Sequence, residues 1–110
     1  MGDRVSIAFK NGNETSVTLF HHWGGMEFVE KARDYAEDLR NEIAKKEYQG
    51  DPIGRLEPNT VMVDFIRYLT IGFGQQRVTS SLYLGKDGND GDNSDNGHHI
   101  INLIREERNR

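Results

Sequence analysis

Apolar and polar positions alternate along the first segment of the chain, residues 3–10. Val5, Ile7 and Phe9 fall on one side of this segment, which is the period of a strand with one buried face. A similar alternation returns in residues 15–22. The intervening Asn11-Gly12 pair favours a tight turn, because such turns require residues that tolerate positive φ. The pattern therefore predicts a β-hairpin.

A helical period replaces the alternation over residues 26–47. Its apolar positions recur at steps of three or four residues, which places them on one stripe of a helix. These positions are Phe28, Ala32, Tyr35, Leu39 and Ile43. Residues 60–73 show the same period around Phe65, with Asp64 and Arg67 predicted to face away from the core. The sequence therefore predicts two amphipathic helices.

Two more strands are predicted towards the end of the chain, over residues 75–85 and 98–107. The order strand, strand, helix, helix, strand, strand indicates an α+β fold built as a two-layer sandwich. We expect a four-stranded, mostly antiparallel sheet with both helices on one face. Since the chain has 110 residues and no visible linker, we expect a single domain over residues 1–110.

The segment 85–97, "GKDGNDGDNSDNG", is rich in aspartate, asparagine and glycine. Such a composition cannot bury apolar area, so we expect a mobile polar surface loop. Its carboxylates, at Asp87, Asp90, Asp92 and Asp95, are of the kind that calcium prefers. A calcium loop of the EF-hand type that began at Asp92 would need glutamate where Leu103 stands. We therefore expect no bound metal, with weak millimolar calcium binding as the alternative.

The stretch "TLFHHWGGMEF" joins the second strand to the first helix. Its candidate ligand-binding residues are His21, His22, Trp23, Gly24 and Gly25. A glycine pair permits close backbone approach, and the N–H groups at a helix start attract anions. The alternative is structural, and we favour it for Trp23: the indole would pack near Phe28 or Val29. Trp23→Ala would then cost about 3–5 kcal/mol.

The sequence contains no catalytic constellation that stands out. Ser6, Thr18, Ser80 and Ser81 are nucleophile candidates beside four histidines. None of them lies on a G-x-S-x-G elbow, and no Walker loop, dinucleotide fingerprint or H-E-x-x-H motif is present. We therefore expect no catalytic residues and no cofactor, and an enzyme is the less favoured class.

Composition narrows the classes of partner. The net charge is −4 and the basic residues are scattered, so no basic stripe is available to contact nucleic acid. Cysteine is absent, which excludes disulfides and thiolate metal sites. No apolar run approaches the ~20 residues needed to cross a bilayer, and no signal peptide is visible. We expect a cytoplasmic protein without membrane contact.

Four short motifs carry a resemblance to a known family: "MGDR" at the start, "FHHWGG" after the hairpin, "GFG" after the second helix and "GHHIINL" near the end. The chain resembles a family of small uncharacterised proteins of phages and prokaryotes, including archaea. Members begin with Met-Gly-Asp/Asn-Arg and carry a "Y/F-x-H-W-x-G" element. The matching residues are Gly2, Asp3, Arg4, His22, Trp23 and Gly25. The resemblance implies a fold and a phage or prokaryotic origin, but no activity, and the loop 85–97 is longer than is usual in that family.

Two hypotheses about function follow. The first is a non-enzymatic binding or interaction module for a small anionic ligand or a host protein. An exposed sheet edge would offer a second place for a partner strand or another copy of the chain. The alternative is a small hydrolase or transferase that acts on an anionic or phosphorylated substrate at His21 and His22, because imidazole titrates near neutral pH.

Overall fold

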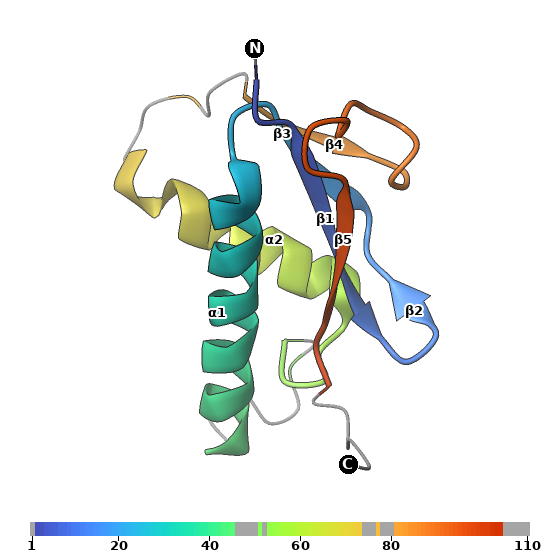
Figure 1. Ribbon diagram of the computed structural model, residues 1–110. Helices are drawn as coiled ribbons and strands as arrows, with labels where there is room; N and C mark the ends of the chain where they lie inside the picture. The colour runs from blue at the N-terminus through green and yellow to red at the C-terminus, as the bar shows by residue number, and fades with distance from the viewer. Residues whose placement is uncertain (1, 46–50, 52, 74–76, 78–80, 105–110) are drawn as a thin grey trace, which may run out of the picture.

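Two helices lie against one face of a five-stranded sheet in the computed structural model, which confirms an α+β fold (Figure 1). The structure describes residues 2–45, 51, 53–73, 77 and 81–104. The strands are β1 (Val5–Asn11), β2 (Glu14–Thr15), β3 (Thr18–His21), β4 (Leu82–Gly85) and β5 (His98–Asn102). The helices are α1 (Gly25–Ala44), α2 (Pro58–Thr70) and the short 3₁₀ helix η1 (Ile71–Phe73).

Strand β1 is the centre of the sheet. It pairs antiparallel with β2 and β3 on one side and parallel with β5 on the other, while β4 extends the sheet beyond β3. The predicted hairpin is confirmed, and Gly12 supplies the positive φ, 62°, at its turn. The predicted second strand, however, is divided into β2 and β3. In the part of the chain that the structure describes, the sheet therefore has five strands in place of the expected four.

The division of that strand has a local cause at Ser16. Its hydroxyl accepts a hydrogen bond from the Phe9 N–H (2.9 Å) and donates one to the Val17 carbonyl (2.7 Å). A side chain thus takes the place of a backbone carbonyl in the ladder, and the regular pairing stops between β2 and β3.

The core lies between the sheet and the two helices. Val5, Ile7 and Phe9 point from β1 into this layer and are fully buried. Phe65 of α2 occupies its centre, with its ring centroid 5.4 Å from that of Phe9 and 5.1 Å from that of Tyr35. The apolar stripes of both predicted helices are confirmed by the buried positions of α1 and α2.

The ends of the elements differ from the expected ranges. Helix α2 begins two residues early because Pro58 is suited to the first helical turn, where its missing N–H leaves no bond unmade. The two predicted C-terminal strands, residues 75–85 and 98–107, extend beyond β4 and β5, and the parts that extend include residues outside the described part of the chain. The end of the first predicted helix, beyond residue 45, also lies outside it. Among the described residues, neither helix is both long enough and apolar enough to cross a membrane.

The loop of residues 86–97 covers the face of the sheet opposite the helices. Strands β4 and β5 both run parallel to β1, on opposite sides of it. The chain that connects two parallel strands must cross the sheet, which takes about a dozen residues. Beneath it, the rings of Phe20 and Tyr83 stack with centroids 4.9 Å apart. The predicted polar loop crosses this face (Figure 1) and is hydrogen-bonded to Tyr83 and Ser6 of the sheet, while its mobility stays a prediction.

Candidate functional site

The corner between β3 and α1 holds the five candidate residues, and it separates the two histidines. The His21 ring lies on the helix side of the sheet, edge-on to Phe28 with centroids 5.0 Å apart. The His22 ring lies near Tyr83, on the loop side, with centroids 5.2 Å apart. Neighbouring residues of a strand point to opposite faces, and the two imidazoles do so here, so they do not converge on one bound group.

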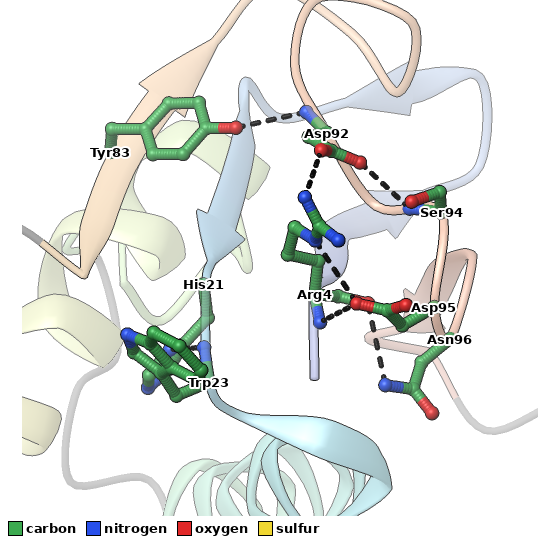
Figure 2. A network of polar contacts seen from close by, with 8 residues as sticks. All are labelled: Arg4, His21, Trp23, Tyr83, Asp92, Ser94, Asp95 and Asn96. Carbon is green, nitrogen blue, oxygen red and sulfur yellow. Dashed lines mark hydrogen bonds and ion pairs between the residues drawn. The ribbon is translucent and has the colours of Figure 1, made fainter. Parts of the chain in front are cut away.

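Trp23 is not buried. The residue is 62% exposed, and its backbone N–H donates a hydrogen bond to His21 Nδ1 (3.1 Å) (Figure 2). The prediction that the indole packs near Phe28 or Val29 is wrong, because the His21 ring packs on Phe28 instead. The expected cost of Trp23→Ala falls accordingly, from about 3–5 kcal/mol to below about 1 kcal/mol.

The glycine pair is explained by the turn itself. A Cβ at Gly24 would lie 2.7 Å from the Phe28 Cβ and 3.0 Å from the His21 Cγ, which is closer than packed carbons approach. Gly25 has a φ of 62°, a conformation that costs other residues about 1–2 kcal/mol. Both glycines are therefore needed for the corner whether or not a ligand binds there.

The chain's own N-terminal segment lies against the start of α1. The Gly25 N–H donates a hydrogen bond to the Asp3 carbonyl (2.9 Å), and the Asp3 N–H donates one to the His22 carbonyl (3.0 Å). The Asp3 carboxylate lies beside Gly25, with Oδ2 3.5 Å from where a Cβ would stand. Since this carboxylate already complements the helix dipole, it would repel a second anion, and the geometry disfavours an anionic ligand at this corner.

Arg4 fastens the crossing loop to the start of β1 (Figure 2). Its guanidinium donates hydrogen bonds to Asp92 (2.7 Å) and Asp95 (3.0 Å), and its backbone N–H also bonds Asp95 (2.9 Å). The hydrogen bond to Asp95 and the charge of Asp92 raise the pKa of Arg4. The pKa of Asp92 is lowered, chiefly by the Ser94 N–H, and that of Asp95 by the Arg4 N–H. The sequence did not predict this pairing of Arg4 with the loop. Its only sign in the sequence was the excess of acidic residues in the loop.

The other two aspartates of the loop also bond to the loop itself. Asp87 Oδ1 accepts a hydrogen bond from the Asn89 N–H (2.9 Å), and Asp90 Oδ2 accepts one from the Lys86 N–H (2.8 Å). These are the short-range bonds by which aspartate shapes turns. Among the described residues, no group of three or more histidine or acidic side chains is arranged to hold a metal ion.

Ser6 and His98 form a serine–histidine contact of the kind that could suggest a nucleophile. Ser6 Oγ lies 2.7 Å from His98 Nδ1 and accepts a hydrogen bond from Asn93 Nδ2 (2.9 Å). Burial, followed by the charge of His99, lowers the pKa of His98. Because Ser6 is fully buried, its hydroxyl cannot reach a substrate. We assign this contact to holding the loop on the sheet.

Removal of the Ser6 hydroxyl is expected to destabilise the protein without changing its binding surface. Ser6→Ala would leave His98 Nδ1 and one Asn93 donor without their partner, at a cost of about 2 kcal/mol. Urea unfolding followed by circular dichroism measures this loss. Thr15→Ala, at an exposed position of β2, is the matched control and should change stability by less than about 0.5 kcal/mol. Equal effects of the two substitutions would contradict the assignment.

A small hollow lies beside the exposed indole. It has a volume of about 230 Å³ and is lined in part by His21, Trp23, Gly24, Glu27 and Lys31. Burial, followed by the charge of His22, lowers the pKa of His21, which keeps this wall of the hollow uncharged at neutral pH. His22 and Gly25, the other two candidate residues, are not among the residues that line it.

No protein-family model, curated protein or solved structure matches the chain. The resemblance to a phage and prokaryotic family, and the origin that it implies, therefore stay predictions. The geometry of the corner is the basis on which a function can be proposed.

Proposed function

We propose that the protein is a non-enzymatic binding module that holds a protein partner on the surface around Trp23. The single observation that carries this proposal is the exposure of Trp23, 62% for the residue, at a corner fixed by backbone hydrogen bonds. Folding gains little from a tryptophan in this position. Exposed tryptophans that stand on rigid supports are, in contrast, frequent anchors of protein–protein interfaces.

The neighbouring side chains extend this surface. Met26 and Tyr68 are 43% and 40% exposed, and with Glu27 and Lys31 they line an open depression next to the hollow. We call these four residues and Trp23 the Trp23 surface. Its apolar groups beside charged ones match the composition of a protein interface, with an apolar centre and a polar rim.

The size of the hollow favours a protein partner over a small ligand at this corner. Its volume of about 230 Å³ is below the roughly 300–1,000 Å³ of small-molecule pockets. A side chain of a partner protein would fill such a hollow while the rest of the partner covers the indole. This fit does not require an anionic group, which the Asp3 carboxylate would repel.

The enzymatic alternative has less support from the same geometry. His21 and His22 diverge, and His21 Nδ1 already accepts the Trp23 N–H. A hydrolase or transferase would need an imidazole and a second group that converge on one reacting atom. We therefore do not favour this class.

A comparison of two exposed apolar side chains tests the proposal. Trp23→Ala and Leu84→Ala each remove one such side chain, and Leu84 is 55% exposed on the edge strand β4. Tagged wild-type and variant proteins would be isolated from the source organism, and the proteins they retain would be quantified by mass spectrometry. We expect a partner that wild type and Leu84→Ala retain and that Trp23→Ala loses at least about tenfold, as at an interface hot spot.

Two outcomes would contradict the proposal. Equal retention by wild type and Trp23→Ala would remove Trp23 from the interface. Loss in Leu84→Ala alone would move the interface to the edge of the sheet, where a partner strand or a second copy of the chain would pair with β4. Thermal melts of each variant show whether it is folded at the temperature of the comparison.

A further inference from the structure

A second and larger cleft lies between α1 and α2 and shares Tyr68 with the Trp23 surface. It has a volume of about 390 Å³, within the roughly 300–1,000 Å³ range of small-molecule sites. Its apolar walls include Leu39 from α1 and Val63 from α2, and its aromatic walls are Tyr35 and Tyr68. These two rings lie with centroids 5.4 Å apart and planes tilted by 42°. The cleft thus offers aromatic faces and aliphatic contacts together.

Asp64 lies partly buried in the wall of this cleft and corrects the prediction that it would face away from the core. It accepts hydrogen bonds from the Tyr35 hydroxyl (2.6 Å) and from Arg67 Nε (2.9 Å). Burial alone would raise the pKa of Asp64, but the bonds from Arg67 and Tyr35 outweigh burial and lower it. Burial and the Asp64 carboxylate raise the pKa of Tyr35. The carboxylate is therefore ionised at neutral pH, and the phenol is a fixed donor.

Two more carboxylates stand at the rim, at Asp38 and Glu42 of α1. Both are exposed, and neither side chain makes a hydrogen bond or ion pair with the part of the chain that the structure describes. Arg67 is the only cation among the described lining residues. Among the described lining residues, three carboxylates stand against one guanidinium, which gives this part of the cleft an excess of negative charge.

We propose that this cleft binds a small organic cation, an ammonium group carried on an aromatic or aliphatic body. Tyr35 and Tyr68 would present ring faces to the cation, and Asp38, Glu42 and Asp64 would supply opposite charge. The body of the ligand would contact Leu39 and Val63. An anion would be repelled by the carboxylates, and a neutral molecule would gain only the apolar contacts. This site goes beyond the proposed function and does not depend on it.

A pair of probes that differ in charge but share one shape tests this inference. Benzylamine is cationic at neutral pH, and benzyl alcohol carries a neutral hydroxyl on the same body. Titration of the whole chain, followed by the amide NMR signals of Val63 and Tyr68, would give a dissociation constant for each. We expect benzylamine to bind at least about tenfold more tightly, and its affinity to fall as salt is added. Equal affinities, no binding of benzylamine, or shifts confined to another surface would overturn the proposal.

Three substitutions test which carboxylates attract the cation. Asp64→Asn should weaken benzylamine binding about tenfold, and Asp38→Asn, at an exposed rim position, about threefold. Glu14→Gln removes one carboxylate from the distant strand β2 and should leave the affinity unchanged. If Asp64→Asn does not fold, Asp38→Asn carries the test alone. An equal loss in Asp38→Asn and Glu14→Gln would mean that only the net charge of the protein attracts the probe, and the proposed site would be wrong.

Discussion

Phe65→Ala is expected to lower the free energy of unfolding by about 3–5 kcal/mol, the range for removal of a buried aromatic ring. Phe65 is fully buried, and its ring lies within about 6 Å, centroid to centroid, of the rings of Phe9, Phe28 and Tyr35. The substitution would therefore leave a cavity where the sheet and both helices meet. Since a domain of this size is stable by only about 5–15 kcal/mol, much of that stability would be lost.

Urea unfolding measured by circular dichroism and by the fluorescence of Trp23 gives this value. The matched control is Val63→Ala on the same helix, because Val63 is 68% exposed. The control should change stability by less than about 1 kcal/mol. A loss of that small size for Phe65→Ala would show that α2 does not pack on the sheet through this ring, and both proposed sites would then lose their supporting framework.

Gly91→Val is expected to destabilise the protein by about 3 kcal/mol, at the upper end of the usual cost of overpacking. A Cβ at Gly91 would lie 2.7 Å from the Tyr83 hydroxyl and 2.8 Å from the Phe20 ring. Both rings are stacked on the sheet and cannot withdraw without breaking that contact. The added side chain would also disturb the hydrogen bond from the Asp92 N–H to the Tyr83 hydroxyl.

Gly72→Val is the control for this substitution, because a Cβ at Gly72 would meet nothing within 4 Å. Amide hydrogen exchange would show whether the effect is confined to residues 86–97. We expect faster exchange at Asp92 and Asn96 in Gly91→Val and little change in Gly72→Val. Similar effects of the two substitutions would mean that the loop does not lie on the sheet.

The parts of the fold that follow from local periodicity were predictable. The spacing of Phe28, Ala32, Tyr35 and Leu39 determines a helix and its buried side without reference to the rest of the chain. The alternation in residues 3–10 does the same for β1. The division of the second strand was not predictable, because it depends on a bond between Ser16 and Phe9 that no period reveals.

The candidate site was predicted in location but not in its details. The sequence placed the two histidines on opposite faces, because neighbours in a strand alternate. The exposure of Trp23 could not be read in the same way, because it depends on His21 covering Phe28. Contacts that join distant segments, such as those of Arg4 with Asp92 and Asp95, leave no local pattern at all.

The crossing loop shows a further feature that could not be predicted from amino-acid composition. Its polar residues gave no sign that the loop would lie on the sheet, because they bury no apolar area of their own. In the fold they cover apolar area that belongs to the sheet, above Phe20 and Tyr83, while their side chains bond the loop's own backbone and Arg4. The cleft between the helices was missed for a related reason. Asp64 has the spacing of a solvent-facing residue on α2, and its bond to Tyr35 joins two helices that no local pattern relates.

Fluorine NMR of the single tryptophan tests the central claim most directly. Because Trp23 is the only tryptophan, protein labelled with fluorotryptophan gives one resonance, from the proposed interface itself. In buffer, this resonance should show the solvent isotope shift of an exposed indole. In an extract of the source organism it should broaden or move, and an excess of unlabelled wild-type protein should reverse the change while unlabelled Trp23→Ala protein does not. A resonance unchanged by the extract, or reversed equally by both competitors, would contradict the claim that the protein binds its partner through Trp23.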